Sequence, residues 1–430
     1  TEVSYFKGTN LTDENMIFDV IDPDSFKGGL KVEYFDNSDL EGEAVVTEEK
    51  KFIDYDWGGA VPHGTLTPGK FSIRYSGVLQ ADFEGNILLG ILEKGGAYKL
   101  FLDGKEVLAG SGGNAVEIES GAFSLQKGKK YKLVLEYRCN NPWESAIQLL
   151  WNKEALKGKD EMMKQVSQSD VIVYVGGISA RVEGEEMPVV IDGFNKGDRV
   201  HMKLPEAQLN LLKKLHATGI PVVGIVASGS ALALNWEKEN LPALLHIWYP
   251  GQAGGAALAD ILFGDYNPSG KLPVTFYKSV EDLPPFEDYH MKGRTYRYFS
   301  GEVLYPFGYG LSYTKFSYGK PELSSASVAM GDKVKVKVKV ANVGDFSGET
   351  VVQLYVSDIE ASVVRPIKSL RHFKKIYLTK GESAEIEFEL SQQDLSVFDD
   401  NGKPFVEKGY FEIYAGEDSA TENKVRLELR

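Results

Sequence analysis

The sequence predicts a multidomain protein that combines a parallel-sheet α/β domain with two β-sandwiches. At 430 residues the chain is longer than one hydrophobic core supports, so we expect about two to four domains. Short runs of alternating apolar and polar residues occur in the N-terminal and C-terminal thirds, which is typical of strands with one wet face. Between them, continuous apolar runs alternate with helical patterns, which is typical of a parallel sheet.

Composition and charge narrow the class of protein. The hydrophobic fraction of 43% and the charged fraction of 26% are those of a globular protein. A net charge of −14 disfavours nucleic acid or an anionic membrane surface as a partner. The single cysteine, Cys139, allows no disulfide framework, and the six histidines lack metal-ligand spacing. We therefore expect a neutral ligand and no metal or other cofactor.

The sequence shows no targeting or membrane-spanning pattern. It has no apolar run of about 18 residues, and "TEVSYFKGTN" at its start lacks the basic and apolar regions of a signal peptide. Three settings stay open: a cytoplasmic protein, an exported protein after processing, and a fragment that begins within a longer protein. A periplasmic or secreted location is slightly favoured over a cytoplasmic one.

Residues 28–151 are predicted to form an antiparallel β-sandwich. Runs such as "KFSIRYSGVLQADF" and "KYKLVLEYR" alternate apolar and polar residues. In "KLFLDGKEVL", Asp103 and Gly104 separate two alternating runs, which is the strongest short-range signal for a hairpin. Trp57 in "DYDWGGAVP" is a candidate for stacking on a sugar ring, and packing in the core is as good an interpretation.

Residues 157–270 are predicted to form a parallel sheet that is buried on both faces. The strands are "DVIVYVGG", "PVVGIVAS" and "ALLHIWYPG", and the helices are "PEAQLNLLKKLHATG" and "QAGGAALADILFG". Functional loops of such a sheet lie at the carboxyl ends of the strands. This puts "GGISARVEGEE", "ASGSALALNW" and "WYPGQAGG" on one rim, where Trp248 and Tyr249 line a sugar site or pack in the core.

The last part of the chain is predicted to be a connector and a small β-sandwich. Residues 268–318 are rich in Pro, Gly and Tyr and have no clear period. In "DKVKVKVKVANVG" lysines alternate with valines, which predicts a strand with one wet face. Further runs at "ETVVQLYVSD", "SAEIEFEL" and "GYFEIYAG" complete a sandwich of the immunoglobulin or fibronectin type.

An acidic loop follows the first strand of the predicted parallel sheet. Its charged residues are Glu183, Glu185, Glu186, Asp192, Asp198 and Arg199. A carboxyl group on such a rim suits proton transfer, because a bound ligand desolvates it and brings its pKa toward neutrality. A solvated loop is the commoner origin of a cluster of this kind.

Two other chemistries are disfavoured near this rim. Gly176 and Gly177 end the strand before the acidic loop, but no phosphate-binding glycine pattern follows them. Ser228 and Ser230 lack the G-x-S-x-G pattern of a nucleophilic serine. The sequence therefore favours neither a dinucleotide site nor a serine hydrolase.

These stretches together resemble the C-terminal half of glycoside hydrolase family 3, the β-glucosidases and β-xylosidases. The resemblance is carried by "VIVYVGGISARVEGEE", "LPEAQLNLL", "GIPVVGIVASGSALAL", "WYPGQAGGAALADILFGDYNPSGKLPVTFY" and "RTYRYFSGEVLYPFGYGLSYTKFSY". The tail "RPIKSLRHFKKIYLTKGE" is similar to the fibronectin type III domain that closes many members. The first sandwich resembles the protective-antigen-type module that some members carry as an insert.

The resemblance implies a division of the chain into four parts. Residues 1–26 and 152–278 form a discontinuous α/β sandwich domain that is truncated at its N-terminal end, because Thr1 falls inside it. Residues 27–151 form the inserted β-sandwich. Residues 279–318 form the connector, and residues 319–430 the fibronectin type III-like domain.

The resemblance also implies a catalytic residue. In the family the general acid/base is a glutamate on the loop after the strand that reads "VIVYVGG" here. Matching the family's "EGxDR" pattern makes Glu185 its counterpart. Because "MPVVIDGFNKG" intervenes before Asp198 and Arg199, Glu183 is the alternative, and Trp57 and Trp248 are weaker candidates for substrate contact.

The second catalytic group of the family is missing from this sequence. Retaining members use an aspartate on an N-terminal TIM-type barrel, and nothing in this sequence resembles that barrel or its "SDW/SDY" motif. Retention requires two carboxyl groups about 5 to 5.5 Å apart. We therefore expect the C-terminal part of an exo-acting retaining enzyme for β-linked oligosaccharides or glycosides. We expect the 430 residues alone to be inactive, and we expect the barrel to belong either to a longer form of this chain or to another chain. The alternative is a non-catalytic carbohydrate-binding protein.

Overall fold

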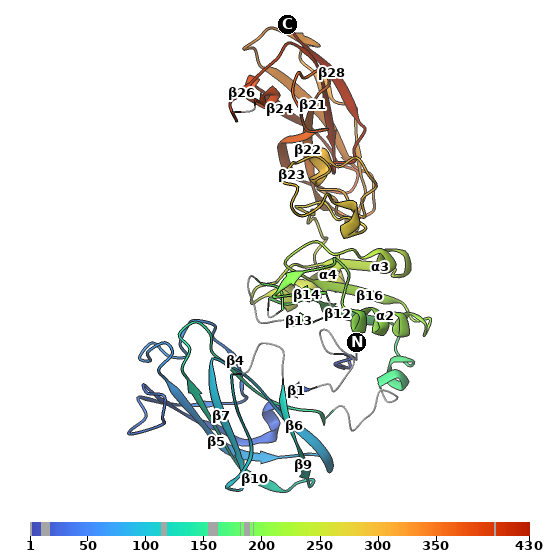
Figure 1. Cartoon of the computed structure of the whole chain (residues 1–430). Helices are drawn as coiled ribbons and strands as arrows, with labels where there is room; N and C mark the ends of the chain where they lie inside the picture. Colours follow the sequence, from blue (N-terminus) through green and yellow to red (C-terminus); the bar gives the residue numbers. More distant parts are fainter. Residues whose placement is uncertain are drawn as a thin grey trace. The chain divides into compact units, whose positions relative to one another are not determined.

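The computed structural model describes residues 2–9, 18–112, 118–153, 162–180, 182–184, 190–191, 193–399 and 401–430. The chain forms two compact units (Figure 1). Unit 1 is Thr1–Val200, Leu204–Gly229 and Asn240–Ile247, and unit 2 is His201–Lys203, Ser230–Glu239 and Trp248–Arg430. Glu185, Glu186 and Asp192 lie outside the described residues.

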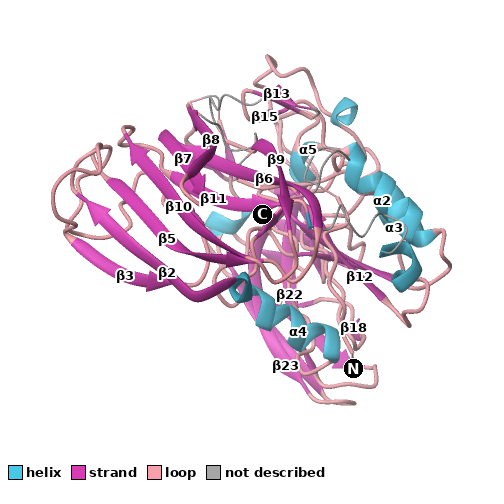
Figure 2. Cartoon of the chain, turned by 90° about the horizontal axis from the view of Figure 1, so that it is seen from below, coloured by secondary structure: helices cyan, strands magenta, loops and turns pink. Residues whose placement is uncertain are grey.

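The N-terminal part of unit 1 is an antiparallel β-sandwich. One sheet has the order β1-β11-β6-β9, with β4 also paired to β11. Its strands are β1 (Asp19–Val20), β4 (Asp54–Asp56), β6 (Gly85–Lys94), β9 (Glu119–Leu125) and β11 (Ala146–Trp151). The other sheet has the order β3-β2-β5-β10-β7-β8 (Figure 2). Its strands are β2 (Phe26–Phe35, after the 3₁₀ turn Pro23–Ser25), β3 (Val46–Lys50), β5 (Ser72–Gln80), β7 (Gly96–Leu102), β8 (Lys105–Ser111) and β10 (Lys130–Cys139).

Alternation along these strands builds a single core between the two sheets. Inward residues of both sheets, among them Leu30, Tyr75 and Leu149, are almost fully buried in one cluster. The predicted hairpin is confirmed: Leu102 pairs with Lys105, and the intervening Asp103 and Gly104 have φ values of 50° and 77°. Positive φ at both turn residues is the geometry that matches the twist of a two-residue hairpin.

The predicted parallel sheet is confirmed in unit 1. Its order is β12-β16-β17, with β12 (Ile172–Gly177) parallel to β16 (Val222–Ala227) and β16 parallel to β17 (Ala243–His246). The predicted helix between the first two strands is α2 (Glu206–His216), which buries Leu212 and Leu215. After β12 comes a small antiparallel sheet of β13 (Val190–Ile191), β14 (Phe194–Asn195) and β15 (Asp198–Arg199).

The expectation that this sheet is buried on both faces is wrong for β12. Val173 and Val175, which alternate with buried Ile172 and Tyr174, are 46% and 63% exposed, and the preceding Val171 is 50% exposed. A parallel strand normally has a layer on each face. The second face of β12 is therefore an apolar surface exposed to solvent in this structure.

Unit 2 contains three further helices among its described residues, together with the C-terminal β-sandwich. The helices are α3 (Asn235–Asn240, its last residue in unit 1), α4 (Gly254–Phe263) and α5 (Thr295–Tyr298), with 3₁₀ turns η2 (Val280–Asp282) and η3 (Gln392–Leu395). One sheet contains β18 (Phe316–Tyr318), β19 (Glu322–Leu323), β21 (Val334–Asn342) and β24 (Ser383–Leu390). The other has the order β20 (Ser327–Val328), β28 (Lys424–Leu429), β27 (Gly409–Gly416), β22 (Gly348–Asp358) and β23 (Ser369–Leu378), and β25 (Val397–Phe398) pairs with β26 (Pro404–Phe405).

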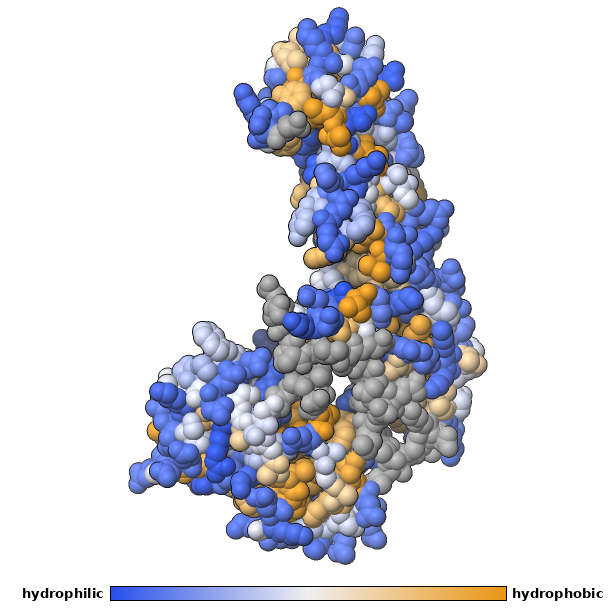
Figure 3. Space-filling model, in the orientation of Figure 1, coloured by the Kyte–Doolittle hydropathy of each residue, from blue (hydrophilic) through white to orange (hydrophobic). Residues whose placement is uncertain are grey.

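The lysine and valine alternation has the structure that was predicted. The valines of β21 are buried in the sandwich core and its lysines are exposed. On the wet face, Lys333, Lys335 and Lys337 form ion pairs of 2.6, 2.7 and 2.6 Å with glutamates of β24. Hydrophilic residues cover much of the face of this sandwich that Figure 3 shows, with small groups of hydrophobic ones between them.

The predicted fold class, α/β combined with all-β sandwiches, is confirmed. The four predicted domain boundaries remain a prediction. Among the described residues, none of the helices has both the length and the hydropathy needed to cross a membrane.

Candidate active site around the acidic loop

Two glycines bring the end of β12 close to its neighbours. Gly177 has φ 126°, which side chains rarely allow, and a Cβ there would overlap the backbone of Ala227 on β16. A Cβ on Gly176 would overlap the hydroxyl of Tyr174. Gly177 is thus required for close packing against β16, and Gly176 leaves room for the side chains of Tyr174 and Gln208. Packing therefore explains both glycines without a phosphate ligand.

Gln208 is a site residue that the sequence reasoning missed. This α2 side chain is only 2% exposed, and it contacts the end of β12. Its Oε1 accepts hydrogen bonds from the Gly177 N–H and the Tyr174 hydroxyl, both at 2.7 Å, and its Nε2 donates to the Gly177 carbonyl at 2.6 Å. Gln208 therefore fixes the direction in which the acidic loop leaves the sheet.

A sequence signal for Gln208 was present. Gln208 precedes Leu212 by four residues and Leu215 by seven, so all three lie on one face of the helix. A polar residue on the buried face of an amphipathic helix needs hydrogen-bond partners. The pattern indicates a buried amide, but it does not name the partner 31 positions earlier in the chain.

Two contacts with described residues help to hold Glu183. Its Oε2 accepts a hydrogen bond from the Gly229 N–H at 3.2 Å, and its Oε1 lies 3.8 Å from Nη1 of Arg199. The two side chains are only 16% and 14% exposed, and the Arg199 guanidinium lies 5.6 Å from the ring centre of Phe194. Glu183 therefore connects the loop after β12 to the loop after β16 and to the β14–β15 hairpin.

The segment that contains Glu185 is bracketed by described residues. The Gly184 N–H donates a hydrogen bond to the Gly197 carbonyl at 3.3 Å. At the far end, Val190 pairs with Asn195 of β14. In the sequence, Glu185 is the next residue after this anchored glycine.

Ser228 and His246 meet at the carboxyl ends of β16 and β17. The Ser228 hydroxyl lies 2.8 Å from His246 Nε2. Burial lowers the pKa of His246 to about 4, so its imidazole is neutral at pH 7. Ser228 is completely buried and cannot reach a substrate, so this contact joins the two strands.

The two tryptophan candidates lie in different units. Trp57 packs against the sandwich core, with its ring stacked on Tyr55 at 5.4 Å and edge-on to Phe71 at 6.3 Å. Trp248 follows β17 with φ 53°, an outlier for a bulky residue, and its ring meets Phe276 edge-on at 6.5 Å. Both rings thus have packing partners, and their role in binding sugar remains a prediction.

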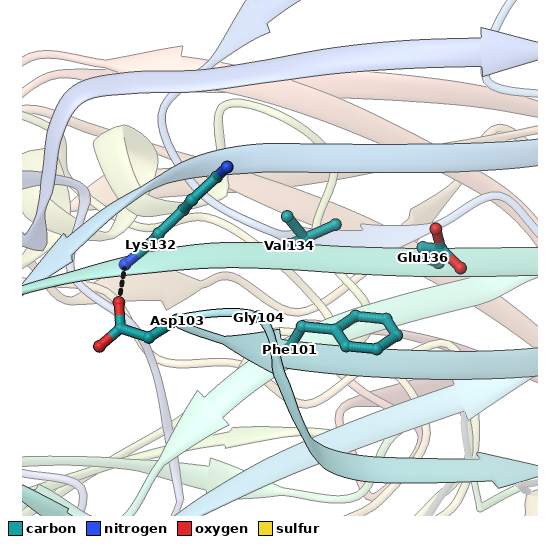
Figure 4. A pocket seen from close by; sticks show the side chains of 6 residues that line it. All are labelled: Phe101, Asp103, Gly104, Lys132, Val134 and Glu136. Atoms are coloured by element: carbon teal, nitrogen blue, oxygen red, sulfur yellow. Dashed lines mark hydrogen bonds between the residues drawn. The ribbon is translucent and has the colours of Figure 1, made fainter.

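Unit 1 has a surface hollow that is not at the rim. It measures about 460 Å³ and lies on the outer side of β7 and β10. Figure 4 shows Phe101 and Val134 on its floor, and Asp103 accepts a hydrogen bond from the Lys132 N–H at 2.8 Å. None of the catalytic or sugar-binding candidates from the sequence lines this hollow, although the predicted hairpin turn at Asp103 and Gly104 does. Among the described residues, no cluster of three or more His, Cys, Asp or Glu side chains has the arrangement of a metal site.

Comparisons with known proteins identify the family. Residues 61–313 match the model described as "Glycosyl hydrolase family 3 C-terminal domain", and residues 350–419 match a "Fibronectin type III-like domain". A "Xylan 1,4-beta-xylosidase" of Xylanibacter ruminicola is 34% identical over 99% of this chain and 50% of its own length. A "Beta-glucosidase" of Rhizobium radiobacter is 31% identical over 91% of this chain and 50% of its own length.

Solved structures agree. The crystal structure of a beta-glucosidase from Kluyveromyces marxianus has a TM-score of 0.75 and 25% identity, covering 93% of this chain and 50% of that one. A b-glucosidase from Erythrobacter marinus has a TM-score of 0.57 and 40% identity, covering 64% of this chain and 37% of that one. The chain spans about half the length of the two curated relatives named above. Because the family model covers more than half of the 430 residues, the chain belongs to glycosyl hydrolase family 3, through that family's C-terminal domain.

Proposed function

We propose that this chain contributes the general acid/base to a retaining, exo-acting β-glycosidase that releases glucose or xylose from β-linked oligosaccharides or glycosides. The observation that carries the proposal is an acidic loop anchored at the carboxyl edge of a parallel sheet, in a member of a glycosidase family. Ligands of such sheets bind outside the carboxyl ends of the strands. The names of the relatives support a β-linked glucoside or xyloside as the substrate.

Glu185 is the proposed acid/base, and the environment of Glu183 supports this choice. Both carboxylate oxygens of Glu183 already have partners, Gly229 and Arg199, within the frame of the loop. An acid that protonates a substrate must bring its carboxyl group within hydrogen-bond reach of the leaving oxygen. Glu183 would lose both contacts to do so. Glu185 follows Gly184, whose backbone is hydrogen-bonded to Gly197, and its use as the acid would break neither contact of Glu183.

The proposed nucleophile is an aspartate outside this sequence. The reaction needs one carboxyl group on each side of the glycosidic bond, about 5 to 5.5 Å apart in retaining enzymes. The relatives have about twice the length of this chain. The exposed valines of β12 supply a second argument, since an apolar face on a parallel strand requires a cover. We infer that a segment with a barrel, in the same or another chain, accompanies this one.

The proposed reaction has two steps. In the first, Glu185 donates its proton to the glycosidic oxygen while the aspartate attacks the anomeric carbon, so that a glycosyl-enzyme forms and the aglycone leaves. In the second, the Glu185 carboxylate takes a proton from water, which attacks the anomeric carbon and releases the aspartate.

Replacement of the three glutamates one at a time in the intact enzyme tests the assignment. For Glu185→Gln we expect kcat on a poor leaving group to fall about 100-fold or more, because protonation of that oxygen is lost. An activated aryl glycoside has a good leaving group, so the first step still proceeds in this variant. Azide needs no general base to attack the glycosyl-enzyme, so added azide should restore turnover, with a glycosyl azide as the product. Glu183→Gln and Glu186→Gln are the matched controls. Azide rescue confined to Glu183→Gln would move the role to that residue.

A carbohydrate-binding protein without catalysis is the alternative function. Titration of this chain with xylo- and gluco-oligosaccharides addresses it, with Trp57→Phe as the variant, because phenylalanine keeps an aromatic ring in the packed cluster. Saturable binding at millimolar concentration that weakens in the variant would favour the alternative. Absence of binding leaves the chain as part of an active site.

A further inference from the structure

A pocket of about 160 Å³ in unit 2 is lined by three arginines. Arg297 lies on α5, Arg365 precedes β23, and Arg371 lies on β23. The remaining walls combine apolar side chains, among them Val356, Leu395 and Phe411, with the buried Asp358 at the end of β22. The pocket is thus far from the acidic loop in sequence and belongs to the other compact unit.

The three guanidinium groups have few acceptors. Arg297 donates to the Ser369 hydroxyl at 3.3 Å and Arg371 to the Ser396 carbonyl at 2.9 Å. The Nε atoms of all three arginines are buried without a hydrogen-bond partner. In the part of the chain that the structure describes, the arginine ion pairs are made by Arg74, Arg138, Arg199 and Arg430. None of them lines this pocket.

Positive charge gathered in this way is unfavourable without an anion. A guanidinium group keeps its charge in proteins, and like charges repel more strongly where water is excluded. Burial and the positive charge of Arg297 lower the pKa of Arg371, against the opposing effect of Asp394. Three carboxylates outside the pocket lining have other partners: Asp394 lies 3.1 Å from His372, Glu407 accepts the Ser362 N–H at 2.9 Å, and Glu360 accepts the Tyr410 N–H at 3.2 Å.

Asp358 is the one carboxylate on the pocket wall. It is 8% exposed, and its Oδ1 accepts a hydrogen bond from the Glu360 N–H at 3.0 Å. Its Oδ2 is buried with no hydrogen-bond partner. Burial raises the pKa of this carboxyl group, against the opposing effects of the Glu360 N–H and of the Arg365 charge. An unsatisfied buried acceptor is costly and calls for a donor. The pocket therefore offers positive charge for an oxyanion and one acceptor for an O–H group.

We propose that this pocket binds a small oxyanion that also carries a hydroxyl group. The anionic oxygens would meet the guanidinium groups, which bind carboxylates and phosphates in a planar, charge-assisted geometry, and the hydroxyl would donate to Asp358. Hydrogen phosphate and a sugar acid such as glucuronate share this chemistry. The proposal is independent of the catalytic assignment of the acidic loop.

Calorimetric titration of this chain tests the proposal, with the thermal midpoint followed in parallel. Phosphate, glucuronate, sulfate and glucose are compared at pH 7.5 and matched ionic strength. We expect saturable binding of phosphate, glucuronate or both, with a rise in the thermal midpoint, because a ligand specific for the folded state stabilises it. Binding of one and not the other shows whether the natural ligand is a phosphate or a sugar acid. Sulfate, which lacks the hydroxyl, and glucose, which lacks the charge, are expected to bind at least about tenfold more weakly.

Three variants make the test specific to the pocket. Arg365→Gln should weaken binding about tenfold or more, because one charge-assisted contact is lost. Arg426 lies outside the pocket, with its guanidinium 4.8 Å from the ring centre of Tyr410. Arg426→Gln should therefore leave binding unchanged. Asp358→Asn should abolish the preference for phosphate over sulfate. Failure of phosphate and glucuronate to bind the wild-type chain, or equal losses in Arg365→Gln and Arg426→Gln, would overturn the proposal.

Discussion

At the scale of single residues, the geometry of the acidic loop depends on one buried amide. Gln208 makes hydrogen bonds to both the N–H and the carbonyl of Gly177. Gly177 is the last residue of β12, the strand that the acidic loop follows. Sequence reasoning predicted the strand, the loop and the helix, because each follows from local periodicity. The amide contact was not predicted, since it joins residues 31 positions apart and depends on how α2 packs on β12.

Gln208→Leu should loosen the start of the acidic loop. The leucine fits an apolar helix face but leaves the Gly177 N–H and carbonyl buried without partners, at a cost of about 2 to 4 kcal/mol. Hydrogen exchange of a peptide covering residues 172–180 should therefore speed up. Lys213→Leu, at an exposed position of the same helix, is the control. Equal protection in the two variants would show that the amide contact does not hold the strand end.

His246 should make the stability of unit 1 depend on pH. Burial lowers its pKa from 6.5 to about 4 in the folded chain, so between these values the unfolded chain binds more protons. The stabilisation is present above pH 6.5 and is lost as the pH falls toward 4, amounting to about 2 kcal/mol after allowance for solvent screening. Denaturant unfolding at pH 4.5 and 7 should show a smaller difference for His246→Gln. His216→Gln, at an exposed histidine of the same unit, is the control.

At the scale of elements, β12 shows that a local sequence pattern predicts a strand correctly but does not predict how much of that strand is buried. The continuous apolar run predicted a strand of a parallel sheet, and the sheet is confirmed. The same run predicted burial on both faces, and this is wrong for Val173 and Val175. An apolar run predicts that its residues are covered, but a sequence pattern does not say which segment covers them.

The exposed valines of β12 permit a test of that cover. Val173→Thr combined with Val175→Thr adds two hydroxyl groups at nearly constant shape. In this chain alone the change should alter the free energy of unfolding by less than about 0.5 kcal/mol per site, as is usual for exposed positions. In the intact enzyme each hydroxyl would be buried, at a cost of about 1 to 3 kcal/mol. Equal effects in the two contexts would show that nothing packs on this face of β12.

At the scale of the whole molecule, the proposed mechanism divides the two catalytic carboxyl groups between this chain and a segment outside this sequence. Family membership is shown, and the chain spans about half of its curated relatives. The proposed acid/base would approach the sugar from one side, whereas retention needs a second carboxyl group on the opposite side. The family resemblance supplied this argument, since composition and periodicity do not distinguish half of an active site from a solvated loop.

The chain alone should therefore neither hydrolyse β-glycosides nor become labelled by a fluorosugar inactivator. Such an inactivator traps the glycosyl-enzyme by slowing its hydrolysis, and without the nucleophile no ester forms. Mass spectrometry of this chain after incubation with 2-fluoro glucosyl and xylosyl reagents should show no added sugar. The intact enzyme, treated in parallel, should gain one sugar on an aspartate outside this sequence. A covalent sugar on any carboxylate of this chain would place the nucleophile here and contradict the assignment, whatever the outcome at Glu185.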